Sequence, residues 1–253
     1  MKNKDIKILD CTLRDGGYVN NFELQNDVIL SILQKLVFAK IDIIECGFLD
    51  EKKGRDFDYL RFKDINVINN LLKNVENINS QFVAMLEYGK YNVEKLSYVN
   101  KSANNIITGI RLSFRKSKYR KIINTAKEII KKNYDLFIQP IATELYSDNE
   151  ILDLIHICND LNIKAMYIVD THGSMMREDI RRLFYLFDRN LRKDIALGFH
   201  SHNNLQMSYA NAIDFIDISR DSSRDIFIDS SIYGMGRGAG NLNTELLLSL
   251  IHI

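Results

Sequence analysis

Short apolar runs alternate along this chain with longer segments in which apolar residues recur at helical spacing. The short runs hold five or six residues rich in Ile, Leu, Val and Phe, as buried strands of a parallel sheet do. We predict strands at residues 6–11, 41–46, 82–86, 107–112, 136–141, 165–169, 195–199 and 226–230. The segments between them predict helices near 24–37, 66–72, 93–99, 122–130, 151–158, 177–186 and 206–216, and a last helix from 244.

Eight strand–helix units in 253 residues predict a single-domain (β/α)₈ TIM barrel that covers residues 1–253. Ser147 and Glu150 have the spacing of a capping box and mark the start of one helix. An open doubly wound sheet is the alternative, and its Gly-x-Gly-x-x-Gly turn is expected after the first strand. Here the alternating glycines of residues 234–240 follow the last strand, which favours the closed barrel.

Composition argues against several classes of protein. The chain has 34 Lys and Arg against 33 Asp and Glu, a formal net charge of +1, whereas a nucleic-acid-binding domain needs a basic face. No stretch approaches the roughly 18 apolar residues that span a bilayer, and the amino-terminal residues lack the apolar core of a secretory signal. Three scattered cysteines suit a reducing compartment. We therefore expect a cytoplasmic metabolic domain that binds neither nucleic acid nor membrane.

Candidate chemistry gathers at the carboxyl ends of the predicted strands, where barrel enzymes build their active sites. His200 and His202 end the seventh strand, and residues i and i+2 of a strand point to the same side. Asp15 follows the first strand, and in a closed ring the first and seventh strands supply side chains to the same layer. Asp15 can therefore converge on both imidazoles as a metal site. A pair of hydrogen-bonded histidines beside a surface turn is the alternative.

The glycine-rich loop at residues 234–240 is a second candidate site. Its glycines permit close backbone approach, and free N–H groups before a helix start suit an anion. This corner of a barrel commonly binds phosphate or carboxylate. Taken alone, the same pattern also describes a flexible surface turn.

Three motifs occur in a fixed order along the chain. They are DCTLRDG at residues 10–16, GFHSHN at 198–203, and a glycine-rich loop that ends in Gly240 and Asn241. Together they resemble the pyruvate-carboxyltransferase or HMG-CoA-lyase-like superfamily of metal-dependent TIM barrels, and look most like its 4-hydroxy-2-oxovalerate aldolases. The resemblance runs from about residue 6 to 248, and residues 169–175 are similar to the superfamily's Asp-Thr-x-Gly turn.

The resemblance implies that Asp15, His200 and His202 bind a divalent metal, with Asn241 as a further ligand or a partner behind them. Mn²⁺ or Mg²⁺ is expected, and Co²⁺ or Zn²⁺ is the alternative. The substrate would be a small keto acid. Arg14 would stabilise the enolate oxygen, since its charge is permanent and its donors are fixed in a plane. A homodimer is implied by the resemblance only.

Two residues, Tyr18 and His172, are candidates for the general acid–base residue. In the aldolases of the superfamily the position of Tyr18 is usually a histidine, thought to be the base, and a phenol is a weak base at neutral pH. Tyr18 would act through a water, position the substrate, or leave the proton to His172, so both are catalytic candidates. The remaining substrate-binding candidates lie at strand ends or in the glycine-rich loop: Glu45, Arg111 for a distal carboxylate, Asp170, Gly238 and Gly240.

The favoured reaction is retro-aldol cleavage of a 4-hydroxy-2-keto acid to pyruvate, or another 2-keto acid, and an aldehyde. Claisen-type condensation of acetyl-CoA with a keto acid is the alternative within the superfamily, although such synthases usually carry a longer carboxyl-terminal region. Metal-dependent hydrolases also use His-x-His, but on the first strand of their barrels. A non-catalytic domain would have no need of Arg14 beside these ligands. The short last helix is also compatible with a truncated carboxyl terminus.

Overall fold

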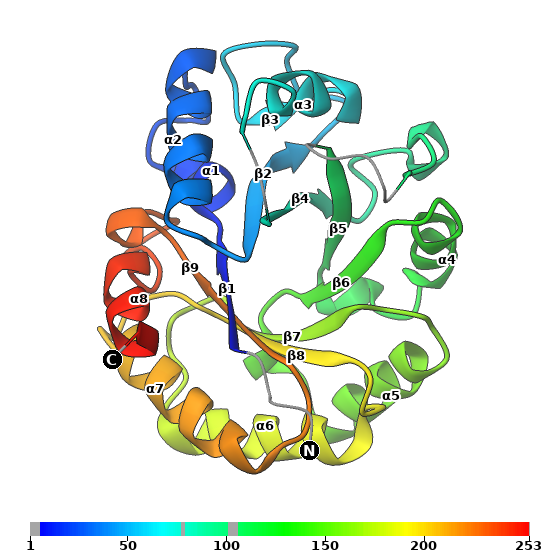
Figure 1. The fold of residues 1–253 in the computed structure, drawn as a ribbon. Helices are drawn as coiled ribbons and strands as arrows, with labels where there is room; N and C mark the ends of the chain where they lie inside the picture. The colour runs from blue at the N-terminus through cyan, green and yellow to red at the C-terminus, as the bar shows by residue number, and fades with distance from the viewer. Residues whose placement is uncertain (1–5, 77–78, 101–105, 253) are drawn as a thin grey trace.

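Eight parallel strands form a closed ring in the computed structural model, which describes residues 6–76, 79–100 and 106–252 (Figure 1). The ring order is β1-β2-β4-β5-β6-β7-β8-β9, and β1 closes it by pairing with both β2 and β9. The strands are β1 (Ile6–Asp10), β2 (Ile43–Leu49), β4 (Gln81–Glu87), β5 (Ile107–Phe114), β6 (Asp135–Pro140), β7 (Ala165–Asp170), β8 (Ala196–Ser201) and β9 (Ile226–Ser230). The predicted (β/α)₈ barrel is therefore confirmed.

Helices surround the ring on its outside (Figure 1). They are α1 (Thr12–Asp15), α2 (Asn26–Phe38), α3 (Ile65–Leu72), α4 (Ile123–Lys131), α5 (Asp148–Asn159), α6 (Arg177–Asn190), α7 (Ser208–Ile218) and α8 (Thr244–His252). The predicted capping box of Ser147 and Glu150 starts α5. A two-residue strand that the sequence did not predict, β3 (Arg61–Phe62), pairs with β2 outside the ring. Among the described helices, none has the length and apolarity of a membrane span.

Two apolar layers hold the barrel together. Inside the ring, a small cluster of buried residues includes Leu9, Phe137 and Phe227, each from a different strand. A larger cluster fills the space between the strands and the helices. The layers take alternate residues along a strand, because successive side chains point to opposite faces. In β9, for example, Phe227 faces inward while Ile226 and Ile228 face the helices.

The second strand extends further than its sequence predicts. β2 runs to Leu49 rather than ending at Cys46, because a bulge between Glu45 and Phe48 lets pairing with β4 resume. Gly47 forms the bulge with a φ of 144°, and a Cβ there would lie 2.5 Å from a backbone oxygen. Only glycine fits this position readily.

The helix expected at residues 93–99 is wrong, since the structure has only a three-residue 3₁₀ turn, Val93–Lys95. Hydrogen bonds from elsewhere take up backbone groups that a helix would have used. The ammonium group of Lys132, just after α4, donates to the carbonyl of Leu96, and the N–H of Val99 donates to the carbonyl of Lys132 at 2.9 Å. Tertiary contacts thus override a local spacing that resembles a helix.

A buried arginine anchors β9, the last strand along the chain. Arg224 lies just before β9, and its fully buried guanidinium donates to the carboxylate of Asp188 at 2.7 Å. Its remaining N–H groups donate to backbone carbonyls in and after α6, among them those of Leu191 and Ile195. These contacts fasten the entry of β9 to the end of α6.

We expect Arg224→Met to lower the free energy of unfolding by about 3 kcal/mol or more, because it removes the buried cation from a largely buried carboxylate and the donor from several backbone carbonyls. Urea denaturation followed by circular dichroism measures the change. Arg220→Met is the matched control, since the Arg220 side chain is 76% exposed, and it should shift stability by no more than about 0.5 kcal/mol. Equal midpoints for the two variants would contradict the anchoring role of Arg224.

Candidate metal centre and active site

α1 places Arg14 and Asp15 at the carboxyl end of β1. Asp10, the last residue of the strand, fastens this single helical turn, because its carboxylate accepts the N–H of Thr12 at 2.9 Å. The other carboxylate oxygen accepts the hydroxyl of Thr244, at the start of α8, at 2.7 Å. Burial raises the pKa of Asp10 to about 6. The first turn of the chain is therefore tied to the last helix.

His200 and His202 meet Asp15 from β8 and the position just past it, across the intervening strand β9. Their Nε2 atoms lie 3.7 and 3.8 Å from Oδ2 of Asp15, and all three side chains are buried. One possible ligand atom from each residue lies within 4.8 Å of the others. The convergence that the sequence predicts for these residues is confirmed.

Asn241 joins this group from the glycine-rich loop. Its Nδ2 donates to Oδ2 of Asp15 at 2.7 Å, whereas its buried Oδ1 has no hydrogen-bond partner among the described residues. Gly236 makes the approach possible, because a Cβ at that position would lie 2.5 Å from Nδ2 of Asn241. The loop thus places beside Asp15 an amide group whose buried oxygen is unpaired within the described part of the chain.

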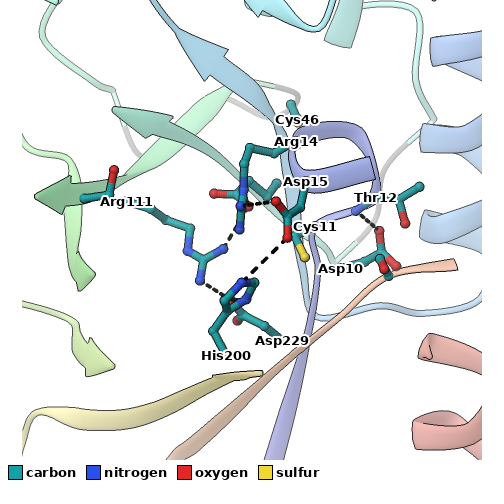
Figure 2. Close-up of polar contacts among 12 residues, drawn as sticks. Asp10, Cys11, Thr12, Arg14, Asp15, Cys46, Arg111, His200 and Asp229 are labelled. Carbon is teal, nitrogen blue, oxygen red and sulfur yellow. Dashed lines mark hydrogen bonds and ion pairs between the residues drawn. The ribbon is translucent and has the colours of Figure 1, made fainter. Parts of the chain in front are cut away.

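A buried chain of charges supports these residues from inside the barrel. Asp229 of β9 lies 2.9 Å from Nδ1 of His200 and pairs with Arg111. Arg111 also donates to Glu45 at 2.8 Å, and the same oxygen of Glu45 accepts from Nε of Arg14 at 2.7 Å. Figure 2 shows how this path runs from Arg14 through Arg111 to His200.

The network sets the protonation states of the site. Burial alone would raise the pKa of Asp15, but the guanidinium of Arg14, 2.9 Å away, lowers it. Burial acts on Asp229 in the same way, and Arg111 lowers its pKa. Burial also lowers the pKa of His202 to about 4, so this ring is neutral at pH 7. An ionised carboxylate and neutral imidazoles are the forms that bind metal ions.

These residues fit a divalent cation. Three carboxylates and two guanidinium groups make up the network, which leaves one negative charge in excess. The ionised Asp229 accepts a hydrogen bond from Nδ1–H of His200, so the Nε2 lone pair is directed toward Asp15. One carboxylate and two imidazoles on one side of an ion leave positions open for substrate oxygens. The unpaired Oδ1 of Asn241 is a further possible ligand.

Two connected cavities open above these residues. The inner cavity, of about 110 Å³, is lined by Arg14, Asp15, His200 and His202 among others. The outer cavity has a volume of about 970 Å³. Both are lined by Tyr18, Glu87, Ile141, Thr171 and Arg237. A molecule that binds in the inner cavity can therefore extend into the outer one.

Both candidates for the acid–base residue face these cavities. Tyr18 is 41% exposed and lines both of them. His172 lines the outer cavity, and its Nδ1 lies 2.5 Å from Oε1 of Glu144. Burial raises the pKa of Glu144. The contact fixes the orientation of the imidazole, while its Nε2 has no partner among the described residues.

Three residues expected to contact substrate make other contacts in the structure. Glu45 and Arg111 have fully buried side chains and line neither cavity, because their charged groups are used within the network. Asp170 accepts the N–H groups of Ser174 and Met175 at 3.0 and 3.2 Å and so caps the turn after β7. Their charged groups are thus used in contacts within the protein, and a direct contact with substrate stays a prediction.

Two N–H groups at the end of the glycine-rich loop, which its sequence suggests as anion donors, are used within the loop. The N–H of Gly240 donates to the carbonyl of Arg237 at 3.2 Å, and that of Asn241 donates to the carbonyl of Gly234 at 2.8 Å. Gly238 is exposed and has a φ of 65°, which favours glycine. The expected contact between Gly240 and an anion is thus replaced by a contact within the loop, while contact with Gly238 stays a prediction.

Two supporting residues were missed at the sequence level. Asp229 is the only charged residue in the apolar strand Ile226–Ser230, and a lone charge in a buried strand is the signal that identifies it. Glu144 lies in the segment after β6 and meets His172 only through the folding of two loops. No local pattern in the sequence predicts that pair.

A barrel whose strand ends hold a buried carboxylate and two imidazoles has the architecture of a metal-dependent TIM-barrel enzyme. Among curated relatives, an oxaloacetate decarboxylase from Mycobacterium tuberculosis is 25% identical, over 96% of this chain and 69% of the relative. A 4-hydroxy-2-oxovalerate aldolase from Geobacillus genomosp. 3 is 22% identical, over 99% of this chain and 72% of the relative. The chain thus spans about 70% of the length of these relatives.

Solved structures show the same fold. The N-terminal domain of a candidate aldolase from Bacteroides vulgatus has a TM-score of 0.82 at 26% identity and covers 97% of this chain and 79% of its own. HMG-CoA lyase from Bacillus subtilis has a TM-score of 0.76 at 13% identity and covers 100% of this chain and 86% of its own. The model of the HMGL-like family matches residues 5–253, and the chain belongs to that family. It is an enzyme of the lyase class, as these relatives are.

We expect the protein to bind one divalent cation and His200→Ala/His202→Ala to abolish that binding, because two of the three clustered ligand groups are lost. Titration calorimetry with Mn²⁺ on protein treated with a chelator measures the stoichiometry. His156→Ala is the control, since this histidine is exposed on α5. Retention of the cation by the double variant would place the metal elsewhere.

Proposed function

We propose that this protein is a divalent-metal-dependent aldolase that cleaves a 4-hydroxy-2-keto acid to pyruvate, or another 2-keto acid, and an aldehyde. The observation that carries the proposal is the meeting of Asp15, His200 and His202 beside Arg14 at the floor of a two-part cavity. The aldolase relatives support it, as does the position of two polar groups, Tyr18 and His172, further out along the same cavity.

Asp15, His200 and His202, with Asn241 as a further ligand, would hold Mn²⁺ or Mg²⁺, and Co²⁺ or Zn²⁺ are alternatives. When bound, the cation supplies Lewis-acid stabilisation for negative charge on the keto oxygen. Arg14 lines the inner cavity, and its Nε and Nη1 are held by Glu45 and Asp15. Its Nη2 has no partner among the described residues and can donate to a substrate oxygen.

His172 is the base in this proposal. The 4-hydroxyl lies two carbons beyond the keto carbon, so it points from the inner cavity toward the outer one. Glu144 holds Nδ1 of His172, which leaves Nε2 to accept the hydroxyl proton. Glu144 also stabilises the imidazolium that forms. Tyr18 lies on the wall between the two cavities and positions the substrate chain.

Cleavage of the C3–C4 bond follows from removal of the hydroxyl proton. As the hydroxyl proton moves to His172, the C4–O bond becomes a carbonyl and the C3–C4 bond breaks. The electron pair of that bond moves to C3 and the keto oxygen, which gives an enolate and releases the aldehyde. Arg14 shares the negative charge of the enolate. The imidazolium of His172 gives up its proton, directly or through water, and C3 takes it up to complete pyruvate, so atoms and charge balance.

Pyruvate release from 4-hydroxy-2-oxovalerate, coupled to lactate dehydrogenase, tests the reaction. We expect activity that depends on divalent cation, and Arg14→Lys should lower kcat by about 100-fold, because one fixed donor to the enolate is lost. Arg220→Lys, on the exposed surface, is the matched control. Pyruvate formed from oxaloacetate but not from any hydroxy keto acid would instead favour the decarboxylase reaction of the other relative.

We expect His172→Gln to lower kcat by about 100-fold or more while metal stoichiometry is unchanged, as loss of a general base does. Glu144→Gln should also lower kcat, by about 10-fold or more, because an amide no longer stabilises the imidazolium and can hold the ring in the wrong tautomer. His156→Gln is the control. If His172→Gln retains activity while Tyr18→Phe loses it, Tyr18 is the base.

A further inference from the structure

The loop after β5 carries five basic residues within seven positions, RKSKYRK at residues 115–121. The whole chain has a net charge of only +1, so this is a local concentration of positive charge. Because the loop follows the carboxyl end of a barrel strand, it lies at the mouth of the site. Four of its cations line the outer cavity, together with Arg237 from the glycine-rich loop.

The cations of the outer cavity fall into two groups. Lys116 and Arg120 pair with carboxylates of α5 at 2.7 and 2.5 Å. Arg115, Lys121 and Arg237 have no ion-pair partner within the described part of the chain. These three side chains are exposed and can reorient toward a ligand.

Charge in the outer cavity is not balanced by its own carboxylates. Only two carboxylates, Glu87 and Glu150, are among its lining residues, and Glu150 is used by Lys116. Because Asp153 neutralises Arg120, the other four cations stand against two carboxylates, which leaves two positive charges in excess. Unpaired guanidinium and ammonium groups around a cavity suit phosphate or carboxylate, to which arginine donates in pairs.

We infer that the outer cavity binds a second anionic group of the substrate, at the end of the chain remote from the keto acid. The inference rests on the proposed aldolase function. The inner cavity, of about 110 Å³, has room for the keto-acid end alone, so the rest of the substrate must lie in the outer cavity of about 970 Å³. Arg237 lines both cavities and marks the path between them. The substrate class is a hydroxy keto acid that ends in a phosphate ester or a carboxylate.

A series of matched substrates tests this class. The series is 4-hydroxy-2-oxohexanoate with hydrogen, hydroxyl, carboxylate or a phosphate ester at carbon 6, all cleaved to pyruvate by the same step. We expect kcat/KM to be about 10-fold or more higher for a charged end than for the neutral ends, since one charge-assisted contact has that effect. The preferred charged end distinguishes phosphate from carboxylate. Equal kcat/KM across the series overturns the inference.

Substitutions of Arg115 and Lys121 test whether these two residues cause the preference for a charged substrate end. Arg115→Gln/Lys121→Gln should reduce the ratio of kcat/KM between charged and neutral substrates by about 10-fold, and added salt should reduce it in the wild type, because exposed charges are screened. Lys118→Gln is the matched control, since this exposed lysine belongs to the same basic run but does not line the cavity. The assignment is overturned if the double variant has the wild-type ratio of kcat/KM between charged and neutral substrates. It is also overturned if Lys118→Gln lowers that ratio as much as the double variant does.

Binding separates this inference from the aldolase function. 2-Oxohexanoate with a phosphate ester at carbon 6 has no 4-hydroxyl and cannot be cleaved, so calorimetry reports its affinity even if no substrate in the series is turned over. Tighter binding than plain 2-oxohexanoate, lost in Arg115→Gln/Lys121→Gln, supports the anion site even when cleavage fails. Equal affinity for the two acids overturns the anion site, whatever the outcome for aldolase activity.

Discussion

The buried ion pairs inside the barrel determine where the reactive groups can lie. Arg14, Glu45, Arg111, Asp229 and His200 contact one another in sequence, in an interior otherwise filled by apolar side chains. Removing either arginine leaves a buried carboxylate without its guanidinium partner in a medium that solvates charge poorly, which costs about 3–5 kcal/mol. Each side chain is therefore restricted to one position. Asp15 and His200 contact this network directly, so their positions are restricted as well.

The fold follows from the sequence wherever the determinants are periodic. Buried parallel strands are continuous apolar runs, so all eight ring strands could be found, whereas the two residues of β3 are too few to show a period. The helix expected at 93–99 failed because Lys132, from the next unit, takes its carbonyls. Local spacing carries no information about such a distant donor.

In the site, too, the contacts fixed by strand periodicity could be predicted, and those made between distant segments could not. Asp15, His200 and His202 could be expected to meet, because strand alternation and ring closure fix their directions, although their role as metal ligands stays a prediction. Arg111 was expected at the substrate, but its carboxylate partners lie on β2 and β9, elsewhere in the ring. The contact of His172 with Glu144 depends on two loop conformations, which propensity does not determine.

Strands and loops have different parts in this molecule. The proposed metal ligands Asp15, His200 and His202 and the neighbouring Arg14 lie on or next to strands, where pairing on both sides limits movement. The cations of the outer cavity lie on exposed loops, which tolerate sequence change without loss of the core. A barrel built in this way can acquire a different remote contact with its substrate while the chemistry at its floor is unchanged.

The position of β9 has a consequence for biosynthesis. β9 is the last ring strand to be synthesised, and it pairs with β1 on one side and β8 on the other. β1 leads to the carboxylate of Asp15, and β8 leads to the two imidazoles. While the ribosome is still producing residues beyond β8, the edges of β1 and β8 stay unpaired, and such edges invite association with other chains. Pairing of β9 with β1 joins residues more than 200 positions apart, so ring closure is a late and slow event.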